Sequence, residues 1–273
     1  MMNNLSTRIL TGTVYVIVIT GGILGNAYTF PALFATVTVL CLWEFYRLMN
    51  TRKQTKINPW YHSLGGALLF ISTYLYASDL VSPVVFLTVP AYAASVLISA
   101  LYQKQPDPIT NSACIFLGHS YITLPLSLMN LLVFSAGQYR PVLAFALFVF
   151  IWMNDTGAYA IGSWKGKHRL FERISPKKSW EGFFGGLFFA VAVSLVFARF
   201  RPEIPYGHWA GLAFVVAIFA TWGDLVESLI KRTLGVKDSG KALPGHGGFL
   251  DRFDSLLLAV YAMLFYVQLF IQK

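Results

Sequence analysis

Long apolar runs alternate with short polar stretches along the whole chain. About nine of these runs have roughly 17–24 residues, the length that an α-helix needs to cross a bilayer. They cover residues 8–25, 27–49, 63–81, 84–102, 112–134, 140–161, 181–200, 208–231 and 253–272. We therefore predict an all-α, polytopic integral membrane protein with about nine transmembrane helices. The first run is expected to remain as a span, because another apolar run follows it almost at once.

The charged residues are few and unevenly placed. Hydrophobic residues make up 56% of the chain and charged residues 12%, against about 25% charged in soluble proteins. The net charge of +9 reflects sorting across the membrane, so no nucleic-acid partner is expected. With a cytoplasmic N-terminus, the outer side would hold only four basic residues, Arg140, Arg199, Arg201 and Lys273. The two long polar loops, 162–180 and 232–252, would then face the cytoplasm.

The acidic residues divide the chain into two parts. Residues 1–140 contain three of them, Glu44, Asp79 and Asp107, and the others lie between residues 150 and 255. We predict that residues 1–140 form an N-terminal transmembrane scaffold. Residues 141–273, with both long loops, would form the catalytic transmembrane region.

A polar stripe ends the apolar run 208–231. Asp224, Glu227, Ser228 and Lys231 follow a helical spacing and share one face. An acid at the centre of a membrane helix costs about 2.5–3.5 kcal/mol. Lys231 could close an internal ion pair with one acid but not with both. A cavity that holds a cation is therefore the better explanation.

A second acidic group begins the run 253–272. Asp251, Arg252 and Asp254 lie there, with the two acids three residues apart. Asp251 could simply cap the helix N-terminus. If the loop instead folds back so that Asp224 and Asp251 converge, their oxygens would suit Mg²⁺, which usually takes one or two carboxylates plus substrate phosphates.

Further candidates lie in the run 140–161 and in both loops. Asp155 lies near the end of that run, and the following loop holds Lys167 and Lys178 among other basic residues. These lysines could neutralise phosphates, or they could serve only the positive-inside rule. His246 lies between two glycines, where it could donate to a phosphate or be an ordinary turn residue.

Three local expectations concern packing. Ser179 is placed to cap the run 181–200, with Glu181 in the first helical turn. The G-x-x-x-G spacing of Gly182 and Gly186 predicts a close helix contact. Glu44 and Arg47 are expected to form a local pair at the membrane interface.

Several other classes are excluded. Gly240 and Gly245 have a P-loop interval, but His246-Gly247 replaces the required Lys-Ser/Thr. The histidines and Cys41 and Cys114 form no zinc pattern. Both cysteines lie in apolar runs, so a disulfide is not expected.

The polar segment 228–254 carries a specific resemblance. Its pattern is Ser228-x2-Lys231-Arg232-x4-Lys237-Asp238-x-Gly240, then Pro244-x-His246-Gly247-Gly248-x2-Asp251-Arg252-x-Asp254. This pattern resembles the signature of the phosphatidate cytidylyltransferase (CDP-diacylglycerol synthase) family. Trp152–Gly162, Ser175–Phe183 and Gly223–Ser228 agree with it as well, so the resemblance covers roughly residues 150–255.

The resemblance implies a multi-pass enzyme of the cytoplasmic membrane that faces the cytoplasm. It would convert CTP and the membrane lipid phosphatidate to CDP-diacylglycerol and pyrophosphate. The reaction would use Mg²⁺, and whether a second cation is bound is left open. The enzyme would form a homodimer. The implied metal ligands are Asp224, Asp251 and Asp254, and the implied catalytic residues are these three with Lys237, Asp238 and His246. The implied substrate-binding residues are Ser228, Lys231, Arg232, Lys241, Arg252, Asp155, Lys167 and Lys178.

Three alternatives were weighed against this function. A CTP-dependent polyprenol or phytol kinase would transfer the γ-phosphoryl group to an alcohol, and the complete signature argues against it. A CDP-alcohol phosphotransferase would need a D-x2-D-G-x2-A-R motif that the chain lacks. A cation-coupled transporter could use Asp224 and Glu227, but its acids should lie near the bilayer midplane.

Overall fold

The computed structural model describes residues 4–104, 107–240, 242 and 247–271, with side chains from residue 9 onward. The chain divides into two compact units. The first comprises residues 1–141 and 234–252, and the second comprises residues 142–233 and 253–273. This division does not test the predicted scaffold and catalytic regions, which stay a prediction.

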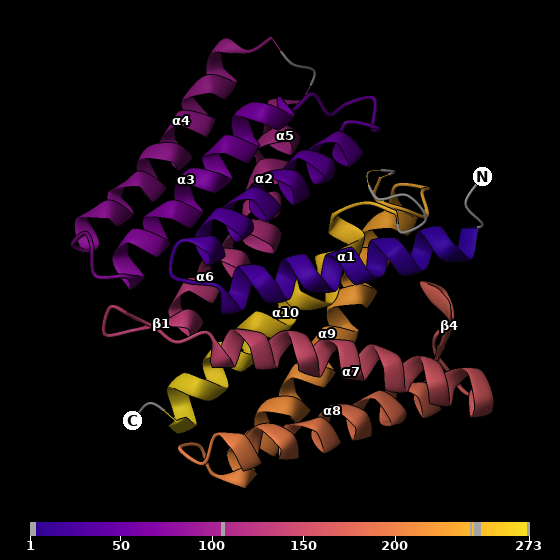
Figure 1. The fold of residues 1–273 in the computed structure, drawn as a ribbon. Coiled ribbons are helices and arrows are strands. Elements are labelled where there is room, and N and C mark those ends of the chain that lie inside the picture. Colours follow the sequence, from indigo (N-terminus) through magenta and orange to yellow (C-terminus); the bar gives the residue numbers. More distant parts are fainter. Residues whose placement is uncertain (1–3, 105–106, 241, 243–246, 272–273) are drawn as a thin grey trace. The chain divides into compact units, whose positions relative to one another are not determined.

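Helices dominate the first unit. They are α1 (Asn4–Leu24), α2 (Thr29–Met49), α3 (Pro59–Ala77), η1 (Pro83–Leu87), α4 (Thr88–Tyr102), α5 (Pro108–Gly118), η2 (His119–Thr123) and α6 (Leu124–Val133). α2 and α3 lie side by side (Figure 1). Fully buried Phe30, Phe34, Phe45 and Tyr46 from α2 form much of this unit's core. The segment 234–252 completes the unit.

A short hairpin in the first unit was not predicted. β1 (Phe134–Ser135) pairs antiparallel with β2 (Gln138–Tyr139). Ala136 and Gly137, between the strands, both have positive φ, 49° and 71°. Two central residues of this kind are typical of the tight turns whose twist matches paired strands.

The second unit contains α7 (Val142–Lys165), β3 (Arg169–Phe171), β4 (Ser175–Ser179), α8 (Trp180–Phe200), α9 (Tyr206–Thr233), α10 (Leu250–Tyr266) and η3 (Val267–Ile271). The first three residues of α10 belong to the first unit. α7 and α8 lie side by side (Figure 1). Near one end of α9, the fully buried Trp209 packs its ring 5.3 Å from Phe197 and 6.4 Å from Phe150.

The predicted glycine contact is confirmed. A Cβ at Gly182 would lie 2.9 Å from the carbonyl oxygen of Ala158, and one at Gly186 would lie 2.6 Å from that of Asn154. Real Cβ atoms do not approach so closely, so only glycine lets α8 lie directly on the backbone of α7. The predicted cap is also confirmed, because Ser179 Oγ accepts a hydrogen bond from the Gly182 N–H at 3.1 Å.

The segment 162–180 is more ordered than a simple loop. α7 continues to Lys165, with the Gly166 N–H still bonded to the Gly162 carbonyl at 3.0 Å. β3 and β4 then form an antiparallel hairpin in which Arg169 pairs with Ser179. Turn-forming residues in this segment indicated a loop, so the hairpin was not predicted. The strand pairing satisfies backbone groups that a loop would leave to water.

The membrane class is confirmed. Each of the nine predicted runs falls on a helical part of the described chain. Seven helical segments in the described residues are long and apolar enough to cross a bilayer, Thr29–Met49, Pro83–Tyr102, Pro108–Val133, Val142–Lys165, Trp180–Phe200, Tyr206–Thr233 and Leu250–Ile271. α3 is not among them, and the apolar part of α1, Ile9–Leu24, is shorter.

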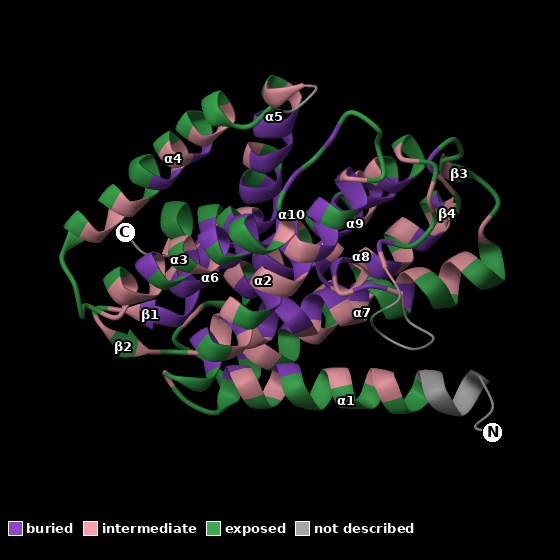
Figure 2. Cartoon of the chain, turned by 90° about the horizontal axis from the view of Figure 1, so that it is seen from above, coloured by how far each residue is buried: buried purple, intermediate pink, exposed green. Residues whose placement is uncertain are grey.

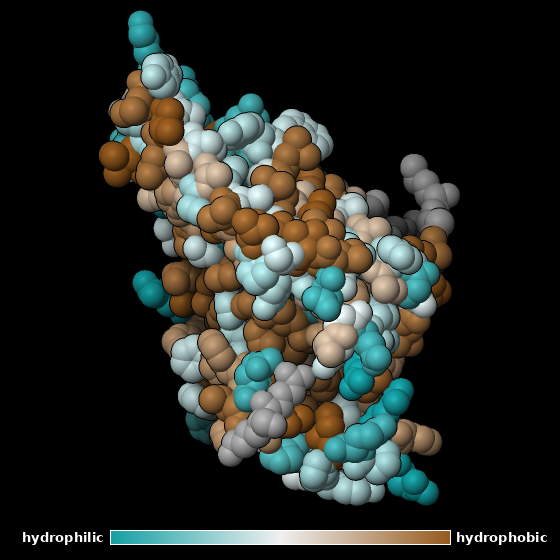
Figure 3. Space-filling model, turned by 90° about the vertical axis from the view of Figure 1, so that its left-hand side faces the viewer, coloured by the Kyte–Doolittle hydropathy of each residue, from teal (hydrophilic) through white to brown (hydrophobic). Residues whose placement is uncertain are grey.

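Apolar side chains cover much of the outside, as lipid contact requires. In α4 only Tyr92 and Val96 are buried (Figure 2), although its segment has a mean hydropathy of 2.1. Figure 3 shows hydrophobic side chains over much of one face. Large exposed residues such as Leu97, Leu101 and Phe188 belong to this apolar exterior.

Candidate active site

Three carboxylates meet in the second unit. Asp224 and Glu227 come from neighbouring turns of α9, and Asp254 comes from α10. One oxygen from each lies within 4.8 Å of the others. Glu227 is fully buried. Hard oxygen donors from two elements, gathered this closely, form a set that suits Mg²⁺.

Two lysines partly neutralise this cluster. Lys178 Nζ, from β4, lies 2.7 Å from an Asp224 oxygen, and Lys231 forms an ion pair with Glu227 one turn away on α9. Ser228 Oγ donates to the other Asp224 oxygen at 3.3 Å. Lys231 therefore closes an internal ion pair with Glu227. A cation bound among the three carboxylates would neutralise further negative charge.

A cavity of about 520 Å³ adjoins the cluster within the same unit. This volume lies in the ~300–1,000 Å³ range of small-molecule sites. Asp224 and Lys178 form part of its wall, and Asp155 from α7 and the basic Arg169 and Lys177 from the hairpin form other parts. Its remaining lining comprises Asn154, Ala158, Tyr159, Gly162, Ser163, Leu170, Ser179, Gly182, Phe183 and Thr221. Cations on one wall and carboxylates on another suit a phosphate-bearing ligand that arrives with a metal ion.

Polar contacts hold the walls of this cavity. The Asn154 amide donates to Thr221 Oγ1 at 3.4 Å, which links α7 to α9. Lys178 Nζ also donates to the Thr221 carbonyl at 3.4 Å. Arg232 Nε donates to the Ile174 carbonyl at 3.4 Å, so the end of α9 supports the turn of the hairpin.

The remaining predicted site residues fall into three groups. Lys167 belongs to the second unit, and its side chain is exposed. Lys237, Asp238, Asp251 and Arg252 belong to the first unit, where Lys237 and Asp238 are exposed. Lys241 and His246 lie outside the described residues. The predicted convergence of Asp224 with Asp251 joins residues of different units, so it stays a prediction.

Asp251 lies in the first turn of α10 and binds backbone N–H groups that precede this helix. Its carboxylate accepts a hydrogen bond from the Gly248 N–H at 2.7 Å and from the Ser239 N–H at 3.1 Å. Both donors precede α10, so Asp251 does not cap the N–H groups of that helix, although the helix dipole favours an acid in its first turn. These two hydrogen bonds do not exclude metal binding, because an ionised carboxylate offers about four lone-pair positions.

Sequence reasoning missed two residues. Glu227 was placed in the polar stripe but not among the metal ligands, although its spacing from Asp224 was the signal that could have found it.

The predicted pair of Glu44 with Arg47 is wrong. Within the described chain, Glu44 accepts a hydrogen bond from the Leu250 N–H at 2.8 Å, while the Arg47 guanidinium lies 4.6 Å from the centre of the Trp43 ring. A partner about 200 residues away is invisible to helical spacing.

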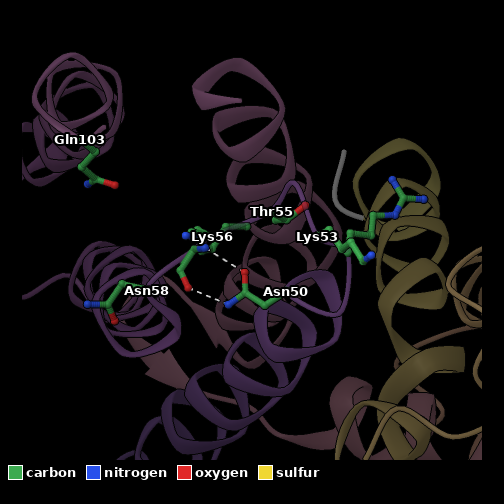
Figure 4. Close-up of a pocket in the computed structure, with 8 residues that line it drawn as sticks. Asn50, Lys53, Thr55, Lys56, Asn58 and Gln103 are labelled. Atoms are coloured by element: carbon green, nitrogen blue, oxygen red, sulfur yellow. Dashed lines mark hydrogen bonds between the residues drawn. The ribbon is translucent and has the colours of Figure 1, made fainter. Parts of the chain in front are cut away.

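A second cavity, of about 570 Å³, lies in the first unit at the turn between α2 and α3 (Figure 4). Arg52, Lys53 and Lys56 contribute its charge. The Asn50 side chain and the Ile57 backbone exchange two hydrogen bonds of 2.8 Å beside it. None of the described residues that line this cavity is acidic, so they do not supply the carboxylates that a divalent cation favours.

Comparison with known proteins decides the family. Residues 6–270 match the family described as the cytidylyltransferase family. The chain belongs to the cytidylyltransferase family. Its members are nucleotidyltransferases by that description, so the resemblance seen in the motif 228–254 is confirmed.

Two relatives show how far the similarity to cytidylyltransferases extends. The chain is 32% identical over 278 residues to a protein of Bacillus subtilis named phosphatidate cytidylyltransferase, covering 98% of this chain and 100% of the relative. It is 48% identical over 115 residues to the protein of that name from Staphylococcus aureus. That match spans only 41% of this chain and 44% of the relative.

Proposed function

We propose that this protein is a phosphatidate cytidylyltransferase of the cytoplasmic membrane. It joins CTP to phosphatidate and releases CDP-diacylglycerol and pyrophosphate. The observation that carries the proposal is the cluster of Asp224, Glu227 and Asp254 beside a cavity with a basic wall, in a chain of the cytidylyltransferase family.

The reaction needs positioning more than proton transfer. A phosphate monoester oxygen of phosphatidate is already anionic near neutral pH. It attacks the α-phosphorus of CTP, a new P–O bond forms, and the bond to the β,γ-pyrophosphate breaks. No proton has to be removed from the nucleophile, so catalysis depends on alignment and on neutralising the phosphate charges.

The residues of the cavity supply this neutralisation. Arg169, Lys177 and Lys178 line it and would hold the triphosphate by charge-assisted hydrogen bonds. Asp224, Glu227 and Asp254 would hold Mg²⁺, with Asp251 as a further carboxylate. Bound there, Mg²⁺ would neutralise charge on the nucleotide phosphates. Lys231 and Ser228 keep Glu227 and Asp224 in place.

The location of these residues suits both substrates. The cluster lies near the end of α9 and the start of α10, the helices on either side of the polar loop 232–252 in the sequence. Positive-inside sorting would place this loop in the cytoplasm, where CTP is dissolved. Phosphatidate reaches the same place from the bilayer. We also propose that the protein acts as a homodimer.

The test uses purified protein in lipid nanodiscs with phosphatidate, Mg²⁺ and CTP labelled at either the α- or the γ-phosphate. We expect the α-label in a cytidine-containing lipid and the γ-label in pyrophosphate. Label from the γ-phosphate on a lipid alcohol would instead identify a kinase. No incorporation of either label into lipid would reject both enzymes.

A further inference from the structure

Glu44 is a buried carboxylate that the proposed reaction does not use. It lies near the end of α2 and is 5% exposed. Within the first unit its Oε2 accepts a hydrogen bond from the Leu250 N–H at 2.8 Å. The backbone at Gly240 and at Gly248 lies directly against its Oε1. A helix of the N-terminal part of the chain thus contacts both sides of the segment 239–250.

Two glycines, Gly240 and Gly248, lie directly against Glu44. A Cβ at Gly240 or at Gly248 would collide with Glu44 Oε1. Any side chain at either position would therefore displace the Glu44 carboxylate or the backbone that contacts it. The glycines of this segment serve a side chain of the protein itself, in addition to any ligand that its backbone approaches.

The same segment holds Asp251. The Gly248 N–H donates to Asp251 Oδ2 at 2.7 Å, and the Ser239 N–H donates to it at 3.1 Å. Gly248 therefore contacts both carboxylates, Glu44 and Asp251, while Ser239 binds Asp251. If Glu44 were removed, the backbone that orients Asp251 would lose its anchor on α2.

We propose that Glu44 is a positioning residue for Asp251. Its buried charge binds the backbone at Leu250 through a charge-assisted hydrogen bond. This bond fixes the two N–H donors, of Ser239 and Gly248, that set the orientation of the Asp251 carboxylate. The proposal rests on the proposed function, because it treats Asp251 as part of the catalytic machinery.

The first test compares Glu44→Ala, Glu44→Gln and the control Arg47→Gln. Arg47 lies one turn further along α2, is exposed, and places its guanidinium over the Trp43 ring. We expect Glu44→Ala to lower kcat/KM for CTP about 10- to 100-fold and to raise the Mg²⁺ concentration needed for half-maximal activity. Glu44→Gln should lose less, because its amide oxygen can still accept from Leu250. Arg47→Gln should match the unchanged protein.

Activity per folded molecule separates positioning from a purely structural role. If Glu44→Ala reduces only the yield of folded protein, with kcat, KM and Mg²⁺ dependence unchanged, the proposal is overturned. Rescue of Glu44→Ala activity by high Mg²⁺ would support the positioning role. Excess Mg²⁺ can compensate for a misplaced carboxylate ligand, but it cannot restore an unfolded protein.

A second readout does not depend on activity. Hydrogen exchange of the Ser239, Gly248 and Leu250 amides should be faster in Glu44→Ala than in the unchanged protein and in Arg47→Gln. Unchanged exchange would overturn the positioning role even if the protein makes CDP-diacylglycerol. Faster exchange in a protein that makes none would reject the proposed function while leaving the anchor intact.

Discussion

The ion pair of Glu227 with Lys231 allows the proposed metal-ligand role of Glu227 to be separated from its structural role. Glu227 is fully buried and Lys231 is 9% exposed. Replacing Glu227 by Gln leaves a buried ammonium without its ionic partner, which costs about 3–5 kcal/mol. At roughly 2–4 °C for each kcal/mol, Glu227→Gln should lower the melting temperature on the order of 10 °C.

Removing both charges should restore most of this stability. Replacement of a buried ion pair by uncharged groups of similar volume is often neutral or stabilising. The double variant Glu227→Gln/Lys231→Met should therefore melt within a few degrees of the unchanged protein. If Glu227 is a metal ligand, the double variant should still lose at least about 100-fold in kcat/KM, because outer-shell changes alone already cost about 10–100-fold.

The assay measures melting temperature and turnover of CTP on the same nanodisc samples. Glu203→Gln is the matched control, because it replaces the same kind of side chain in an exposed ion pair. The Glu203 carboxylate lies 4.0 Å from the Arg201 guanidinium. Recovery of activity together with stability in the double variant would refute the ligand role, since Glu227 would then serve only to neutralise Lys231.

Three further predictions follow from the same unit. Lys178→Met should raise the KM for CTP about 10- to 100-fold, and Lys178→Arg should raise it less. Ser228→Ala should change this KM less than about threefold. Equal effects of the two Lys178 variants would contradict a role for the lysine charge. Gly223→Ala should reduce turnover more than thermal stability, and a normal turnover would show that the approach of α9 to α10 does not matter. Chelation of divalent ions should abolish turnover, and added Mg²⁺ should restore it. Ca²⁺ should restore less, because it favours more oxygen ligands at longer distances. Turnover that survives chelation would contradict the metal site.

The fold and part of the site could be predicted from the sequence. The lengths of the apolar runs predicted the helices, because a helix satisfies every backbone hydrogen-bonding group within a bilayer and few other structures do. The spacing of Asp224, Glu227 and Lys231 placed them on one face, and Ser179 was found as a cap, since both patterns are local. The hairpin 169–179 was missed because its strands are short and exposed. The contact of Glu44 with Leu250 joins distant parts of the chain, and no local pattern reports such a pairing.

The close approach of α9 and α10 explains how like charges come to share one place. A Cβ at Gly223 would lie 2.6 Å from the carbonyl oxygen of Asp254 and 3.1 Å from the Cα of Ser255. Only glycine permits this approach, and it brings the next residue of α9, Asp224, beside Asp254. Packing of α9 against α10 therefore opposes the repulsion between the two carboxylates, while Lys178 reduces it. Under the proposed function, a site assembled by backbone packing would need little rearrangement on binding a cation and a nucleotide, and such preorganisation favours phosphoryl transfer.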